Sequence, residues 1–196
     1  MTKDDLIAFE TEIADLFNAG GIPYPVHLSD GSEDQLIRIF QDIDRDDWVF
    51  GSWRMHYECL LHGVPPADLK AAILRGGSIS LCFPEYRVYS SAIVGGILPI
   101  ALGAAMGIKL SRGTNRVHCF IGDMTVETGI AHECIKYSRN HHLPIRWIIA
   151  RNGHSVLTPV DAVWGSKTTW GFHADVEAYD YKSKYPHAGA GKRVEF

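Results

Sequence analysis

Two short apolar runs with a helical segment between them most constrain what this chain can fold into. Residues 117–121 and 145–149 are rich in β-branched and aromatic side chains, which favour strands, and residues 127–141 carry helical periodicity. The order strand, helix, strand predicts a βαβ unit with two parallel strands. We therefore expect an α/β domain of three layers, with helices on both faces of a mostly parallel sheet.

A polar stretch follows each of these expected strands. Gly122-Asp123-Met124 comes after the first, and Asn152-Gly153-His154 comes after the second. Ligands of such sheets bind at the carboxyl ends of the strands, so we expect Asp123 and Asn152 to lie close together. A carboxylate, an amide oxygen, a backbone carbonyl and a diphosphate form a suitable set of ligands for Mg²⁺. The competing interpretation is structural, with Asp123 capping the next helix and Asn152-Gly153 forming a turn.

A longer pattern surrounds these polar ends, and it includes Gly122-Asp123, Gly129, His132-Glu133, Leu143-Pro144 and Asn152-Gly153. This pattern is similar to the thiamine-diphosphate signature of the α subunits of 2-oxoacid dehydrogenase decarboxylase components. Residues 93–105 resemble the helix-opening segment that those subunits place against the cofactor's rings. Residues 51–54 resemble their phosphate-contacting turn. Three segments in the same order, spanning about residues 48 to 160, therefore imply a thiamine-diphosphate-binding fold.

The resemblance implies a role for each matching residue. Asp123 and Asn152 would bind Mg²⁺ through their side chains, and His154 would bind it through its carbonyl. Arg54 would pair with the diphosphate, because a guanidinium fork matches phosphate oxygens, and Val94 would hold the cofactor in its bent shape. The implied cofactor-binding residues are Trp53, Arg54, Val94, Gly95, Leu98, Gly122, Asp123, Met124, Thr125, Asn152 and His154. The alternatives are a surface cation for Arg54, a core residue for Val94 and a plain loop residue for His154.

The chain also departs from the family pattern. Met124 stands where the signature ordinarily has Gly, and Trp53 replaces a Tyr, so its indole N–H can donate a hydrogen bond but cannot accept one. The histidine-bearing active-site loop of the family has no clear counterpart, which leaves His173 and His187 as candidates by default. No catalytic residue is therefore assigned from the sequence.

The resemblance further implies that this chain is half of an enzyme. In the family, the glutamate that protonates the pyrimidine ring lies on a separate pyrimidine-binding domain, for which 196 residues leave no room. We therefore expect a β-like partner subunit that carries this domain, in an α2β2 heterotetramer. The implied reaction is decarboxylation of a 2-oxoacid with acyl transfer. The alternatives are transketolase-like ketol transfer and a degenerate subunit without turnover.

Composition is consistent with one globular domain. We divide residues 1–196 into a core at about 48–160, a helical N-terminal part at 1–47, and a tail or partner-docking arm at 161–196. A net charge of −4 without a basic cluster argues against nucleic acid as a partner. The four cysteines lack CxxC spacing, and no signal peptide opens the chain, so we expect reduced thiols and a cytoplasmic location. No GxGxxG follows a strand, which makes nucleotide binding a weak alternative.

Residues 92–108 form an uncharged stretch that is nearly long enough to cross a bilayer. Pro99 and four glycines interrupt it, so we expect a buried helix and no membrane span. A helix that is apolar all round must be covered on every side, in this family partly by the partner subunit. The other elements expected are helices at 2–18, 33–44 with Ser32 as the cap, and 65–77, and a strand at 48–50.

Overall fold

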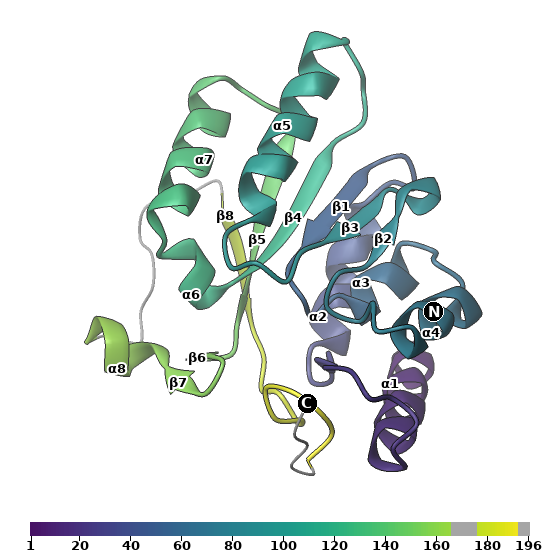
Figure 1. Ribbon diagram of the computed structural model, residues 1–196. Helices are drawn as coiled ribbons and strands as arrows, with labels where there is room; N and C mark the ends of the chain where they lie inside the picture. Colours follow the sequence, from purple (N-terminus) through teal and green to yellow (C-terminus); the bar gives the residue numbers. More distant parts are fainter. Residues whose placement is uncertain (166–175, 192–196) are drawn as a thin grey trace.

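The computed structural model describes residues 1–165 and 176–191. A six-stranded sheet runs through its centre in the order β2-β3-β1-β4-β5-β8 (Figure 1). All neighbouring strands of this sheet are parallel except β2, which is antiparallel to β3 at one edge. The strands are β1 (Trp48–Gly51), β2 (Cys82–Phe83), β3 (Val88–Ser90), β4 (Val117–Gly122), β5 (Ile145–Arg151) and β8 (Val176–Asp180).

Helices cover both faces of the sheet (Figure 1). One face packs against α5 (Ile97–Leu110) and α7 (Gly129–Asn140), and the other shares a hydrophobic core with four helices. Those four are α1 (Lys3–Asn18), α2 (Glu33–Ile39), α3 (His56–Leu61) and α4 (Pro66–Leu74). Successive side chains of β4 point to opposite faces of the sheet and contribute to both hydrophobic cores. Cys119 and Ile121 lie on the α5 side, and Phe120 lies on the other side. The expected three-layer α/β fold is confirmed.

The register of β4 against β5 brings the two polar stretches together. Val117 pairs with Ile145 and Gly122 pairs with Ala150, so the strands end side by side. Asp123 begins the short helix α6 (Asp123–Val126) directly after β4, and Asn152 follows β5. The expected βαβ unit is therefore present. The helix expected at 127–141 is observed as α7, and Thr128 caps it by accepting a hydrogen bond from the amide of Ala131. The short helix α6, which precedes it, was not expected.

The first helix forms as expected, whereas the second differs from the prediction in its N-terminal cap and in its end. Thr2 and Asp5 form a capping box at the start of α1. Ser32 stands at the N-cap position of α2, but its hydroxyl donates to the carbonyl of Ser29 at 3.0 Å, so the expected side-chain cap is wrong. The chain also tightens into a 3₁₀ turn (Phe40–Asp42) after Ile39, where we expected the helix to continue to residue 44.

The glycines expected past the end of the third helix are confirmed. Helix α4 ends at Leu74, Gly76 follows with a φ of 88°, and the amides of Gly76 and Gly77 donate to the carbonyls of Ile73 and Ala72, both at 2.9 Å.

Helix α3 and the strands β2, β3 and β8 were not expected from the sequence. Beyond β5 the chain also forms a small two-stranded sheet of β6 (His154–Ser155) and β7 (Thr158–Pro159), followed by α8 (Val160–Trp164).

The apolar segment forms α5, which begins at Ile97 and not at residue 92. One face of α5 is buried, including Leu98 and Ala101, whereas Ile100 is 45% exposed. The chain by itself therefore covers only one side of this helix, and covering by a partner stays a prediction. Within residues 1–165 and 176–191, no helix is both long and apolar enough to span a membrane.

Part of the expected C-terminal arm lies against the chain's own N-terminal part. The amide of Gly189 donates to the carbonyl of Val26 at 2.9 Å, and Lys184 forms an ion pair with Asp30 at 3.0 Å. The Nε2 atoms of His27 and His187 lie 3.1 Å apart. The segment after β8 thus packs back onto residues 26–30. Residues 192–196, which belong to the same expected arm, lie outside the described residues.

Candidate functional site

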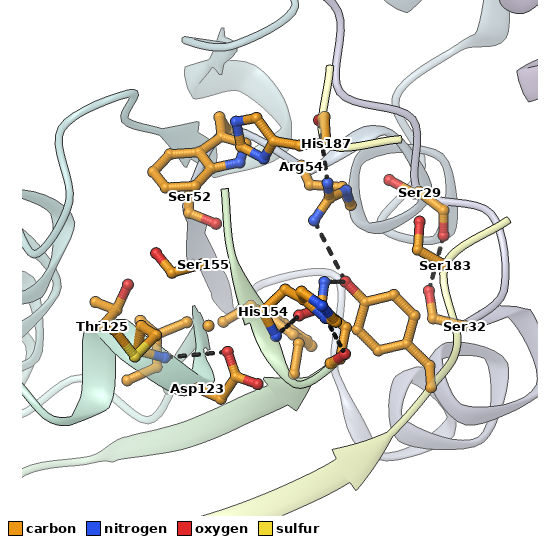
Figure 2. A pocket seen from close by; sticks show the side chains of 18 of the residues that line it. Ser29, Ser32, Ser52, Arg54, Asp123, Thr125, His154, Ser155, Ser183 and His187 are labelled. Carbon is orange, nitrogen blue, oxygen red and sulfur yellow. Dashed lines mark hydrogen bonds between the residues drawn. The ribbon is translucent and has the colours of Figure 1, made fainter. Parts of the chain in front are cut away.

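A cavity of about 480 Å³ opens at the carboxyl ends of the strands. Its wall combines the loop after β1, the start of α6, the turn after β5 and the segment after β8 (Figure 2). This is the edge at which parallel sheets bind ligands, because the loops that follow neighbouring strands converge there. Residues far apart in the sequence, such as Arg54, Asp123 and Asn152, therefore share one cavity.

Asp123 is a buried carboxylate held by backbone amides. Its side chain accepts hydrogen bonds from the N–H of Met124 at 3.0 Å and from the N–H of Gly153 at 2.8 Å. Burial raises the pKa of Asp123 above its ordinary value, and the hydrogen bonds from Gly153 and Met124 act in the opposite direction. The bond to Gly153 also ties the end of β4 to the turn after β5, so the position of Asp123 is coupled to that of Asn152.

Asn152 is oriented through both ends of its side-chain amide. Its Oδ1 accepts from the backbone N–H of His154 at 3.0 Å, and its Nδ2 donates to the hydroxyl of Tyr181 at 3.2 Å. Gly153 follows with a φ of 76°, a left-handed conformation that favours glycine. The expected turn at Asn152-Gly153 is present. It does not exclude a binding role, because this turn directs the Asn152 side chain into the cavity wall.

Arg54 is anchored to the chain at three points. Its Nε donates to the carbonyl of Leu28 at 2.9 Å, while its Nη1 donates to the hydroxyl of Tyr181 and its Nη2 to the carbonyl of His187, both at 3.3 Å. The guanidinium is therefore a positioned group in the cavity wall, with its direction set by contacts from two distant segments (Figure 2). The alternative of a free surface cation is wrong.

Eight of the eleven cofactor-binding residues expected from the sequence line this cavity: Trp53, Arg54, Gly122, Asp123, Met124, Thr125, Asn152 and His154. The other three lie outside its lining, at the start of α5. Val94 is 52% exposed, Leu98 is fully buried in the core, and Gly95 has a φ of 76°. Val94 is therefore no core residue. The cofactor roles expected for these three residues stay predictions.

The cavity also contains polar residues that the sequence did not indicate. Glu58 on α3 is 4% exposed, and its Oε2 has no hydrogen-bond partner among the described residues. Tyr181 follows β8 and contacts both Arg54 and Asn152. The sequence did not indicate Glu58 because α3, the helix that carries it, has only six residues, which are too few to show helical periodicity. Recognition of this helix would have placed Glu58 about one turn after Arg54.

The two histidines considered for the missing active-site loop have different outcomes. His187 lines the cavity, with its ring 6.0 Å from that of Trp53. Burial lowers the pKa of His187, and the nearby positive charge of Arg54 lowers it further. His173 lies outside the described residues.

The donor groups of the cavity suit a hard cation. Asp123 and Asn152 offer oxygen atoms, and the described residues contain no group of three or more His, Cys, Asp or Glu side chains that could hold a metal. Mg²⁺ is typically bound by one or two carboxylates together with substrate phosphates. Asp123 also forms no ion pair with the described lysines and arginines that would offset its burial. These residues therefore fit Mg²⁺ with a phosphate ligand.

Comparison with known proteins places the chain in a family. Residues 1–171 match the family described as dehydrogenase E1 component. The α subunit of acetoin:2,6-dichlorophenolindophenol oxidoreductase from Bacillus subtilis is 26% identical over 167 residues, which cover 80% of this chain and 50% of that protein. The pyruvate dehydrogenase E1 component α subunit from Rickettsia prowazekii is 29% identical over 170 residues, covering 81% of this chain and 52% of that protein.

A solved structure from Mycobacterium smegmatis, of an enzyme provisionally described as thiamin diphosphate-dependent, resembles this chain with a TM-score of 0.46 at 18% identity. It matches 65% of this chain and 23% of the other. The chain spans about half the length of the curated relatives named above. Because the family match extends over residues 1–171, the chain belongs to the dehydrogenase E1 component family.

Proposed function

We propose that this chain binds the diphosphate of thiamine diphosphate through Mg²⁺ and acts as the α-like subunit of a heteromeric 2-oxoacid dehydrogenase. One observation carries the proposal. Asp123 and Asn152 follow neighbouring parallel strands, are linked through the hydrogen bond from Gly153 to Asp123, and line one cavity with Arg54. A metal ligand set beside a fixed guanidinium suits a metal-bound diphosphate.

Each residue has a definite task in this proposal. The side chains of Asp123 and Asn152 and the carbonyl of His154 bind Mg²⁺, and the guanidinium of Arg54 binds phosphate oxygens. The indole of Trp53 adds a donor. The amide of Met124 already donates to Asp123, so it serves the phosphate less directly. Burial of Asp123 raises its pKa, and a bound cation would favour the ionised form and reverse that effect.

The chemistry of the reaction belongs to the cofactor. When bound, thiamine diphosphate supplies a thiazolium carbon that adds to the keto carbon of a 2-oxoacid and accepts the electrons released on decarboxylation. The residues of this chain bind and orient the diphosphate end. Val94, with its exposed side chain, is proposed to support the bend of the cofactor from the start of α5. The relatives are named as α subunits, which supports a β-like partner subunit. In this proposal the partner carries the pyrimidine-binding domain, in an α2β2 assembly.

Removal of a proposed metal ligand tests the site. Loss of a group that only orients a metal ligand costs about 10- to 100-fold in metal affinity, so Asp123→Ala and Asn152→Ala should each lose at least that much in Mg²⁺-dependent binding of thiamine diphosphate. Arg54→Ala should lose less. Isothermal titration calorimetry with Mg²⁺ and thiamine diphosphate measures the affinity, and circular dichroism confirms the fold.

Asp68→Ala is the matched control, since Asp68 is an exposed carboxylate on α4 outside the cavity lining. This variant should bind like the unaltered chain. Unchanged affinity in Asp123→Ala would overturn the metal assignment.

A further inference from the structure

The hydroxyl of Tyr181 joins two side chains on opposite sides of the candidate site. Arg54 donates to it from the loop after β1 at 3.3 Å, and Asn152 donates to it from the turn after β5 at 3.2 Å. Strand β4 lies between β1 and β5 in the sheet, so the two donors do not come from neighbouring strands. Tyr181 therefore connects the proposed phosphate-binding side chain to a proposed metal-binding side chain.

Backbone hydrogen bonds of the sheet position Tyr181. Its N–H donates to the carbonyl of Arg151 at 3.0 Å, which continues the pairing of β8 with β5. The side chain of Gln35 donates to the carbonyl of the preceding Asp180 at 2.9 Å. The ring of Tyr181 also lies 5.9 Å from the ring of Tyr179. These contacts hold the hydroxyl at the cavity wall before any ligand binds.

The hydroxyl of Tyr181 can still donate one hydrogen bond. A phenol has one O–H donor and an oxygen that accepts, and both described bonds use the oxygen as acceptor. Burial raises the pKa of Tyr181 above its ordinary value, so the proton is retained at neutral pH. The O–H of Tyr181 has no described acceptor within the protein, and the residue lines the cavity. The O–H can therefore donate to a ligand that accepts hydrogen bonds.

We propose that Tyr181 is a diphosphate-binding and positioning residue: it holds Arg54 and Asn152 by accepting from both, and it donates its own proton to a phosphate oxygen. This inference rests on the proposed function and adds a residue to the site. The acceptor is anionic because the neighbouring donor, Arg54, is a cation. A hydrogen bond from a neutral hydroxyl to a charged oxygen is stronger than one between neutral groups.

Tyr181→Phe is the direct test, because it removes one oxygen atom and keeps the ring. We expect the affinity for Mg²⁺ with thiamine diphosphate to fall about 10- to 100-fold, the range for loss of a hydrogen bond to a charged group. Tyr137→Phe, the same change at a half-exposed tyrosine on α7 outside the cavity lining, should bind like the unaltered chain. Circular dichroism and thermal melting should show the same fold in both variants.

Two further measurements separate a ligand contact from a merely structural effect. Inorganic pyrophosphate with Mg²⁺, measured by competition, should lose affinity to a similar extent, since the contact is to the phosphates. In a double-mutant cycle, Arg54→Ala combined with Tyr181→Phe should lose less than the product of the single losses, because the two residues are coupled.

The results distinguish failure of this inference from failure of the proposed function. If the unaltered chain binds and Asp123→Ala does not, but Tyr181→Phe binds normally, only the inference on Tyr181 is overturned. Loss of affinity for thiamine diphosphate with unchanged affinity for pyrophosphate would also overturn it. If the unaltered chain binds neither ligand, alone or together with its β-like partner, both proposals fail.

Discussion

Glu58 places a carboxyl group in the cavity where the protein offers little compensation for its charge. The residue is 4% exposed, and its Oε2 has no hydrogen-bond partner among the described residues. Burial raises its pKa from the ordinary 4.5 to about 8, although its own backbone amide and the charge of Arg54 lower it. Glu10, which is also buried, raises it further. Glu58 is therefore largely protonated at neutral pH.

This pKa predicts a pH-dependent contribution to stability. The folded chain keeps the proton up to about pH 8, whereas the unfolded chain releases it near pH 4.5. The unfolding free energy contributed by Glu58 is therefore fully present below pH 4.5, and it is lost as the pH rises to about 8. Glu58→Gln should have little effect at pH 5 and be more stable than the unaltered chain at pH 8.5, by up to about 4 kcal/mol.

Urea unfolding at several pH values measures this difference. Glu133→Gln, at an exposed position on α7, is the control and should show no such trend. A difference between Glu58→Gln and the unaltered chain that stays constant from pH 5 to pH 8.5 would contradict the assignment.

At the scale of the element, α5 combines a packed face with an open one. Leu98, Ala101 and Ala105 are fully buried against the sheet and α7. On the open side, a Cβ added at Gly103 would meet no atom within 4 Å. Just before the helix, Gly95 has a φ of 76°, and a Cβ there would lie 3.0 Å from a methyl carbon of Ile130. The same substitution should therefore have opposite effects at these two glycines.

We expect Gly103→Ala to stabilise the isolated chain by about 0.5 to 1 kcal/mol, because alanine favours the helix interior. Gly95→Ala should destabilise it by about 1 to 2 kcal/mol, because a left-handed residue with a Cβ is strained. Thermal and chemical unfolding of the two variants measure both effects. A loss of stability in Gly103→Ala would show that the open face of α5 is covered even in the isolated chain.

The whole molecule exposes several large apolar side chains. Ile93 is 72% exposed before α5, Leu157 is 79% exposed between β6 and β7, and Trp164 is 51% exposed on α8. Leu157 lines the cavity, and the indole of Trp164 donates to the sulfur of Met124, which also lines it. Large exposed apolar side chains are typical of a protein interface. We therefore expect a partner chain to cover this region and to complete the site.

Catalysis should accordingly depend on assembly. The chain alone should neither turn over 2-oxoacids nor remain an active monomer near 21.8 kDa. Activity should appear on mixing with a β-like partner, thiamine diphosphate, Mg²⁺, a panel of 2-oxoacids and an artificial electron acceptor. Size-exclusion chromatography with light scattering reports the assembly. Robust turnover by the purified chain alone would refute this expectation, and activity on sugar phosphates would favour ketol transfer.

The sequence by itself determined the parts of the fold that rest on local patterns. The apolar runs at 117–121 and 145–149 predicted β4 and β5 because strand preference and burial act along a few consecutive residues. The position of Asp123 beside Asn152 followed, since parallel strands end at the same edge. Arg54 was found through its resemblance to a family motif, which local pattern alone would not have shown.

Only the tertiary structure decided which distant side chains share the cavity. Tyr181 reaches it because β8 pairs with β5 after a long connection, and strand pairing of that kind leaves no periodic signal in the sequence. Glu58 reaches it on a helix of six residues, too short to be recognised. The exposed face of α5 could not be predicted from the sequence either. Hydrophobicity predicts that an apolar helix is covered, whereas the packing of the whole chain decides which face of the helix the chain itself covers.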